Sequence, residues 1–450
     1  MKKKTDVDML HGSLWKNILR YAVPIMLTTL LQLFFHSADL IVVGNFAGSD
    51  SLAAVGATGS ISNLVVSLFM GLSVGAGVTV AHALGSKNYR AITEAVHTAI
   101  PLAAICGAVL TVVGILLARP LLVRMNTPAN ILDKATLYMQ IYFAGIVAIM
   151  LYNFGGAILR AAGDSKSPLF FLFISGGLNV VLNVIFVALF HMDVAGVALA
   201  TTLTNALSAV LVLLALCRRT DACRLSLKKM RIYKAPFREI LRIGIPSGIQ
   251  SSLFTFANTI IQSSVNSFGS VVVSGKSAAS NLDSIIGLGS TAFGQTAINF
   301  TAQNMGAGNY KRIHRILHWC FLQSSILALL LGSVAFLFRY PILEIYLPDS
   351  PESVYWGAQC LQITALLFPI ANMMDISSNV LRGMGKSILP TVISILCICG
   401  FRLLWNYTVF QIPAFHTIQS IQCSFPISWF LSLSATYVTY LITYRQLRNR

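Results

Sequence analysis

A few carboxylic acids lie inside long apolar segments of this sequence, where a charge is expensive. They are Asp39, Asp283 and Asp375, together with Glu94, which lies closer to the end of its segment. A charged side chain at the centre of a bilayer costs at least about 2.5 kcal/mol, so an acid in such a place is a functional candidate by default.

Asp39 belongs to a polar stripe on the first apolar segment. Gln32, His36 and Asp39 are spaced i, i+4 and i+7, which places them on one face of a helix. Burial of a lone carboxylate disfavours its charged form, so Asp39 is suited to binding a proton, or a cation where neighbouring oxygen atoms complete the site. We expect a functional role for Asp39, because side chains that only join helices need no acid.

Two later segments carry amides and hydroxyls at helical spacing. Asn179 and Asn183 are four residues apart, and so are Thr201 and Asn205. These stripes and that of Asp39 would converge on one pocket in the N-terminal half. The alternative is that the amides and hydroxyls only hydrogen-bond the helices to one another. The sequence does not decide between these readings for the Asn and Thr residues.

The C-terminal half carries polar groups of both signs. The candidates for its interior are Gln250, Asn258, Lys276, Asp283, Asp375 and Arg402. Lys276 and Asp283 are seven residues apart, close enough in angle to share a helix face, and Arg402 could neutralise Asp375 or Asp283. Because both signs are present, structural ion pairs are the favoured prediction, with binding of a substrate as the alternative.

A duplication organises the chain. LGSKNYRAI (84–92) returns as MGAGNYKRI (305–313), and ILRAAGDSKSP (158–168) returns as VLRGMGKSILP (380–390). AVPIMLTTLLQ (22–32) likewise aligns with GIPSGIQSSLF (244–254). A nearly constant offset indicates one copied half and predicts two similar lobes. The ionisable groups were not copied, because Ile261 stands where the repeat would place Asp39.

Composition identifies the class of protein. Hydrophobic residues make up 56% of the 450 residues and charged residues 10%, against about 25% charged in soluble domains. Apolar runs of roughly 20 residues recur along the whole length, as a polytopic membrane protein requires. The twelve candidate helices are 15–40, 50–80, 91–117, 131–157, 167–190, 194–217, 237–265, 275–303, 314–338, 354–380, 388–410 and 421–444.

The formal charge of +17 indicates orientation in a membrane and not binding to nucleic acid. With a cytoplasmic N-terminus, 26 of the 32 Lys and Arg fall on the cytoplasmic side, and two lie within spans, which is the positive-inside pattern. Only Arg119, Arg124, Lys134 and Arg339 fall outside. We predict a multi-pass protein of the plasma (inner) membrane with both termini cytoplasmic.

The predicted fold is all-α, with twelve transmembrane helices in two six-helix lobes. Residues 1–217 form the N-terminal lobe, 218–238 a basic cytoplasmic linker and 239–450 the C-terminal lobe. An even number of spans in each half means that both halves enter the membrane from the same side. The pseudo-two-fold axis should therefore run along the membrane normal.

Taken together, these segments make the chain resemble the multidrug and toxic compound extrusion (MATE) family, prokaryotic type, over essentially its whole length. The resemblance rests on HSADLIVVGNFAG (36–48), the paired loop cassettes, LNVVLN (178–183), GVALATT (196–202) and GIPSGIQSSLFTFANTIIQSSVNSFG (244–269). It implies secondary active export of organic, often cationic or amphipathic, compounds by antiport with Na⁺ or H⁺ through alternating access.

The resemblance also implies an ion-coupling site in the N-terminal lobe. Asp39 matches the family's first-helix carboxylate, and Asn179 and Thr201 match its fifth-helix Asn and sixth-helix Thr. A transported Na⁺ would then bind near Asp39. The position that is often Asp in that branch is Asn183 here, so this site has one carboxylate fewer.

Two other function classes are alternatives to transport of this kind. A lipid or lipid-linked oligosaccharide flippase of the related superfamily tends to line its cavity with Arg and Lys, and here only Lys276 and Arg402 lie in predicted spans. An intramembrane enzyme is disfavoured, because the sequence has no recognisable metal motif or protease pair. The expected partners are a small-molecule substrate, a coupling cation and the lipid bilayer, with no cofactor, no resident metal and a monomeric state.

Overall fold

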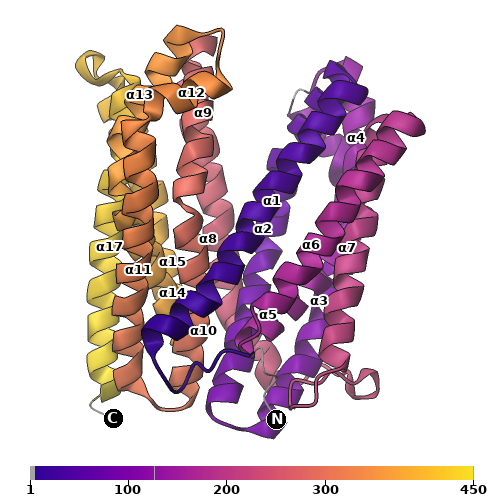
Figure 1. Cartoon of the computed structure of the whole chain (residues 1–450), viewed down its shortest axis with the longest axis vertical. Helices are drawn as coiled ribbons and strands as arrows, with labels where there is room; N and C mark the ends of the chain where they lie inside the picture. Colours follow the sequence, from indigo (N-terminus) through magenta and orange to yellow (C-terminus); the bar gives the residue numbers. More distant parts are fainter. Residues whose placement is uncertain (1–5, 126, 449–450) are drawn as a thin grey trace. The chain divides into compact units, whose positions relative to one another are not determined.

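The computed structural model describes residues 6–125 and 127–448, and within them the secondary structure is helical with no strand (Figure 1). Nine helices, or ten when one bent pair is taken as a single span, are long and apolar enough to cross a membrane. The described part of the chain is thus that of an all-helical membrane protein, as predicted.

The first half contains seven α-helices. They are α1 (Leu14–Phe46), α2 (Ser49–Gly85), α3 (Tyr89–Arg124), α4 (Ala129–Ala144), α5 (Ile146–Ala161), α6 (Lys166–Asn183) and α7 (Asp193–Cys217). A π-helical segment, η1 (Val184–Leu189), continues α6 without interruption. A short 3₁₀ segment, η2 (Leu227–Lys229), lies between the halves.

The second half repeats this order with more interruptions. Its α-helices are α8 (Lys234–Asn266), α9 (Ser270–Ile286), α10 (Leu288–Gly306), α11 (Tyr310–Leu337), α12 (Arg339–Tyr346), α13 (Pro351–Thr364), α14 (Phe368–Gly383), α15 (Ile388–Ser394), α16 (Phe401–Tyr407) and α17 (Ile418–Arg448). Short segments join some of them: η3 (Ala365–Leu367), η4 (Ile395–Gly400), η5 (Val409–Gln411) and η6 (Pro413–Phe415). Of these, η4 is π-helical and continues α15.

Three of the predicted helices are broken, which corrects the sequence prediction. The segment predicted at 131–157 bends by 44° between α4 and α5 at Gly145. The segment at 275–303 breaks at Gly287, and the segment at 354–380 has a 3₁₀ turn between α13 and α14. A Cβ at position 145 would lie 2.7 Å from the Thr202 side chain, so glycine lets the bend pack closely against α7.

The chain divides into two compact units, and two of the boundaries between them fall inside helices. Among the described residues, unit 1 contains 6–8 and those of 27–248, and unit 2 contains 9–26 and 249–448. Compared with the predicted division, 9–26 belongs with the second half and 239–248 with the first. Helices α1 and α8 each change unit two residues after an internal proline, Pro24 and Pro246, where one backbone hydrogen bond of the helix is missing.

Helix packing within each unit follows the same scheme. In unit 1, α5 contacts α2, α3 and α7, and α6 packs on α7. In unit 2, α14 contacts α10, α11 and α17, and the α15–η4–α16 helix packs on α17. The sequence repeat is therefore a repeat of three-dimensional packing.

The turns of the repeated cassettes are also alike. Gly163 and Gly385 end α5 and α14 with φ of 98° and 77°, as the glycine-ended helices of the sequence predict. At the other pair of turns, Lys87 has φ of 54° where its repeat partner, Gly308, has φ of 70°. The backbone shape was retained there while one copy lost the residue best suited to it.

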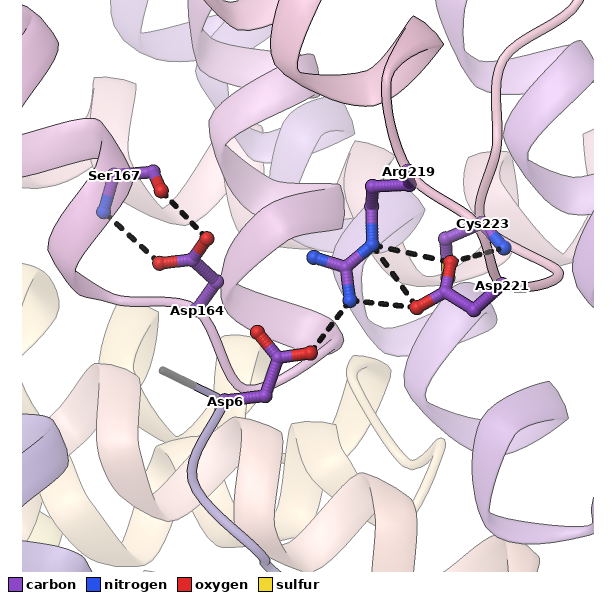
Figure 2. Close-up of polar contacts among 6 residues, drawn as sticks. All are labelled: Asp6, Asp164, Ser167, Arg219, Asp221 and Cys223. Atoms are coloured by element: carbon purple, nitrogen blue, oxygen red, sulfur yellow. Dashed lines mark hydrogen bonds and ion pairs between the residues drawn. The ribbon is translucent and has the colours of Figure 1, made fainter. Parts of the chain in front are cut away.

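An ion-pair cluster in unit 1 joins residue 6 to the loop after α7 (Figure 2). The buried Arg219 side chain donates to Asp6 at 2.7 Å and to Asp221 at 2.6 Å. Burial raises the pKa of Asp6. Burial acts in the same direction on Asp221, but the hydrogen bonds and charge of Arg219 outweigh it and lower that pKa. Arg219 thus holds two carboxylates in one buried network.

Candidate functional site

Asp39 heads a chain of hydrogen bonds inside unit 1. The Asn183 amide donates to Asp39 Oδ1 and also, at 3.2 Å, to Asn179 Oδ1. The Asn179 amide in turn approaches the hydroxyl oxygens of Thr201 at 3.5 Å and Thr204 at 3.4 Å. Three helices, α1, α6 and α7, therefore contribute to one polar group.

The helices position these groups by simple periodicity. Asn179 and Asn183 lie one turn apart at the end of α6, and Thr201 and Thr204 lie on one face of α7. The π-helical segment η1 begins directly after Asn183. Such segments are rare and frequently lie at functional sites, because they shift the register of the side chains that follow.

Two oxygen atoms of this group have no hydrogen-bond donor among the described residues. The Asn183 side chain is fully buried, and its Oδ1 is without a hydrogen-bond partner among the described residues. Asp39 accepts only from Asn183, and no described Lys, Arg or His lies within ion-pair distance of it. An uncompensated carboxylate beside a free amide oxygen is an arrangement that receives a proton or a hard cation.

Some predicted members of the site lie apart from it. Gln32 and His36 are exposed, and in the described structure neither bonds to Asp39. Asn205 is partly buried but takes no part in the hydrogen-bond chain. The structure brings Asp39, Asn183, Asn179 and Thr201 together, and their role in ion coupling stays a prediction.

Sequence reasoning missed three hydroxyls that extend the group. Thr204 accepts from Asn179, and further along α6 and α7 the Ser208 hydroxyl donates to Ser175 at 2.7 Å. The signal was present, because Ser175 lies one turn before Asn179, and Thr204 and Ser208 lie one turn apart. The stripes on α6 and α7 therefore form a continuous polar ladder between the two helices.

Close packing fixes α1 against this ladder. The Phe35 ring lies against Gly176 of α6, where a Cβ would stand 1.9 Å from the ring. Beyond Asp39, Val42 and Val43 are buried with Val187 and Val197 in a small apolar cluster. Asp39 thus lies between an aromatic contact and an apolar cluster.

The corresponding region of unit 2 carries cations. Lys276 Nζ lies 4.0 Å from Asp283 Oδ2, so these residues form the predicted ion pair, and Thr364 donates to Asp283 at 3.1 Å. Arg402, in contrast, forms no ion pair in the described structure, and of its two predicted acid partners only Asp375 attracts its charge, at longer range. Its Nε donates to Ser428 Oγ at 2.9 Å and its Nη1 to Asn258 Oδ1 at 3.4 Å.

The remaining candidates of unit 2 form a separate network. Ser290 donates to Asp375, one turn from Asn379 on α14. Arg382 donates to Asn379 at 3.1 Å and to Gln250 at 2.6 Å. Asp375 is therefore held by a hydroxyl, and Gln250 serves a structural arginine. In the described part of the chain, no three His, Cys, Asp or Glu side chains gather into a metal-binding group.

Comparison with known proteins then decides the family. The MatE family model matches residues 24–185 and 246–408, one copy in each half of the chain. The chain belongs to the MatE family. These two matches coincide with the two repeats seen in the sequence and in the packing of the helices.

Relatives and solved structures agree with this assignment. A probable multidrug resistance protein, YpnP of Bacillus subtilis, is 29% identical over 86% of this chain and 87% of its own length. Another from the same organism, YoeA, is 25% identical over 96% of this chain and 95% of its own. A crystal structure of a MATE protein in complex with MaL6 superposes over all of both chains with a TM-score of 0.92 at 20% identity, which shows the same fold. This MATE protein is therefore a multi-pass membrane transporter with twelve helices in two lobes.

Proposed function

We propose that this MATE protein exports amphipathic organic compounds in exchange for an inward-moving Na⁺ or H⁺ that binds at Asp39. The observation that carries the proposal is the uncompensated Asp39 carboxylate, hydrogen-bonded only to Asn183. The names of the relatives, which are probable multidrug resistance proteins, support export as the direction of transport.

The Asn183 amide can serve both states of such a site. Its Nδ2 stabilises the ionised carboxylate of Asp39, and its unpartnered Oδ1 would accept a hydrogen bond from the protonated acid after rotation of the amide. The same Oδ1, the carboxylate of Asp39 and the oxygens of Asn179 and Thr201 would be the ligands of a Na⁺ ion. Binding of either cation neutralises the only charge in this group.

Neutralisation would change how α1 meets α6. The ionised acid needs the Asn183 donor, and the neutral acid does not. A cation that binds with different affinity in two arrangements of α1 shifts the balance between them, which is the requirement for coupled transport. We further propose a monomer in the plasma (inner) membrane with both termini cytoplasmic, on the basis of the positions of Lys and Arg.

Transport into inside-out vesicles tests the proposal. Na⁺ and H⁺ gradients are imposed separately, and uptake of the cationic dye tetramethylrhodamine methyl ester is compared between wild type and Asp39→Asn. Asp133→Asn is the matched control, because Asp133 is an exposed acid paired with Arg119. In wild type and in the control, one of the two gradients should raise uptake by about tenfold or more. In Asp39→Asn, neither gradient should raise uptake. Uptake that ignores both gradients, or that survives in Asp39→Asn, contradicts the proposal.

A further inference from the structure

Three cationic side chains are buried in the described structure, and they differ in how their charge is balanced. Arg219 binds two carboxylates, Asp6 and Asp221. Lys276 has Asp283 at 4.0 Å. Arg402, which is 2% exposed, has no carboxylate within ion-pair distance among the described residues. A buried charge without a counter-ion is destabilising, so its retention calls for an explanation.

Arg402 forms no ion pair among the described residues, although Asp375 attracts its charge at longer range. Ser428 and Asn258 accept from Nε and Nη1, whereas Nη2 is buried without a partner. The guanidinium carbon lies 4.2 Å from the centre of the Phe425 ring and 5.5 Å from that of Phe254. Aromatic faces weakly stabilise a cation but do not neutralise it.

Neither Asp283 nor Asp375 forms an ion pair with this guanidinium in the described structure. Asp283 binds Lys276 and Thr364, and Asp375 binds Ser290. Lys276 moreover lies over the same ring as Arg402, 5.4 Å from the centre of Phe425. Two cations therefore share one aromatic side chain, and only one of them has an anionic partner.

Helix α8 connects Arg402 to a polar surface. Asn258, which accepts from Nη1, has an exposed side chain, as do Gln262 and Asn266 further along α8. This helix is also absent from the set apolar enough to span a membrane by itself. Polar side chains in membrane helices face the protein interior or water and not lipid. The Arg402 guanidinium is thus linked by the Asn258 amide to the polar face of α8.

The backbone next to Arg402 is also unusual. The π-helical segment η4 ends at Gly400, two residues before Arg402, just as η1 begins directly after Asn183 in unit 1. In each unit the fifth helix of the repeat therefore carries a π-helical segment beside an uncompensated charge. Segments of this kind frequently lie at functional sites.

From these observations we propose that Arg402 binds the anionic group of an exported aromatic compound, a carboxylate, sulfonate or phosphate. The free Nη2 and the adjacent Nη1 donate to the anion, Lys276 adds a second positive charge, and Phe254 and Phe425 contact the aromatic body. The planar fork of arginine suits such groups because it donates two parallel hydrogen bonds. The inference rests on the proposed export function and adds the substrate class.

Binding to purified protein in detergent tests this without any ion gradient. Two xanthene dyes of similar shape and opposite charge serve as probes: fluorescein, an anion, and tetramethylrhodamine methyl ester, a cation. Fluorescence anisotropy should show that Arg402→Gln weakens fluorescein at least about tenfold, since a charge-assisted hydrogen bond is lost. Arg402→Lys should lose less, and the affinity for the cationic dye should not fall in either variant.

Arg339→Gln is the matched control. Arg339 also lies over two aromatic rings, those of Phe336 and Tyr340, but it is partly exposed and remote in sequence from the Arg402 group. It should bind fluorescein as wild type does. Lys276→Gln gives a second readout if Arg402→Gln does not fold, and it should weaken fluorescein as well. Equal fluorescein affinity in wild type, Arg402→Gln and Lys276→Gln overturns the proposal.

Two further arms separate the alternatives. Replacing chloride with gluconate in the buffer should change the affinity for fluorescein by no more than about twofold. If chloride binds at Arg402 and the dye does not, the proposal that Arg402 binds an organic anion is overturned. Combined with Asp39→Asn, Arg402→Gln should still weaken fluorescein binding. If transport depends on an ion gradient but Arg402→Gln does not change dye binding, this inference alone is refuted. If Arg402→Gln weakens dye binding but transport depends on neither gradient, only the proposed coupling is refuted.

Discussion

The two units of this MATE protein use the same helix packing but bury charges of opposite sign. In unit 1, an isolated acid, Asp39, is bonded to the neutral amide of Asn183. In unit 2, a base that forms no ion pair in the described structure, Arg402, is bonded to the neutral side chains of Ser428 and Asn258. The duplication therefore preserved the scaffold while each copy acquired its own electrostatic character.

The difference shows that the fold itself demands neither charge. Position 261, where the repeat would place Asp39, holds a buried isoleucine. A packed core accepts an apolar residue as readily as an ion pair, and often more readily. We therefore propose that each of these charges meets a charged ligand from outside, a cation in unit 1 and an anion in unit 2.

The largest expected effect comes from removing each of the two charges in a separate variant. Asp39→Asn should abolish the dependence of transport on the ion gradient, while Arg402→Gln should retain that dependence for the cationic dye and lose fluorescein. Vesicle uptake of both dyes, measured for both variants, checks this expectation. If either variant removed both properties, the two units would not have the separate roles that their charges indicate.

Stability provides a second test, because Arg219 and Arg402 are both buried but only Arg219 is paired. Arg219→Gln strands the carboxylates of Asp6 and Asp221 and should cost about 3–5 kcal/mol. Arg402→Gln removes an uncompensated charge, so it should be neutral or stabilising. Unfolding in detergent measures both changes in stability. A large loss of stability in Arg402→Gln would mean that the hydrogen bonds and packing of Arg402 stabilise the fold by more than its buried charge costs.

The effect of Arg219→Gln should also depend on pH. The pKa of Asp221 is lowered in the folded state, so its contribution is present above the ordinary carboxyl pKa and is lost as the pH falls through the lowered value. The deficit of Arg219→Gln should therefore shrink in acid. Burial raises the pKa of Asp6, so its ionised form lowers the free energy of unfolding at neutral pH. Asp6→Asn should therefore cost less stability than Asp221→Asn at neutral pH.

Packing around Asp39 gives a smaller, sharply controlled effect. In Gly176→Ala the new methyl group would overlap the Phe35 ring, which should cost about 1–3 kcal/mol and move α1. The neighbouring Gly177 has open space around a Cβ, so Gly177→Ala should be neutral or stabilising. Thermal unfolding of both variants checks this. Equal behaviour would show that α1 yields freely at Phe35.

The smallest effect concerns the repeated turn. Lys87 adopts the left-handed conformation that Gly308 adopts in the other copy, so Lys87→Gly should stabilise by about 1 kcal/mol or less. Gly308→Lys should destabilise by a similar amount. Both values follow from unfolding measurements, with Lys87→Ala as a control that keeps the backbone penalty. Stabilisation by Lys87→Ala equal to that by Lys87→Gly would exclude the conformational explanation.

Much of this molecule could be predicted from local signals. The repeated cassettes predicted the copied packing, and the spacing of Asn179, Asn183 and Thr201 placed these residues on the faces that meet beside Asp39. The breaks at Gly145 and Gly287 were not predicted, because glycine in an apolar helix is common and only a neighbour such as Thr202 makes it a bend. Arg402 was assigned an ion pair that it does not form in the described structure, since periodicity gives the face of a residue but not what meets it.

The sequence by itself determined the helices, their duplication and the acid that the first of them carries, because hydrophobic length and period are properties of a single segment. Only the tertiary structure decided which charges are compensated. Arg219 and Arg402 are alike as sequence letters, yet one meets Asp6 and Asp221 and the other meets two hydrogen-bond acceptors and two aromatic rings. Compensation depends on distances between segments far apart in the chain, and those distances exist only after the helices pack.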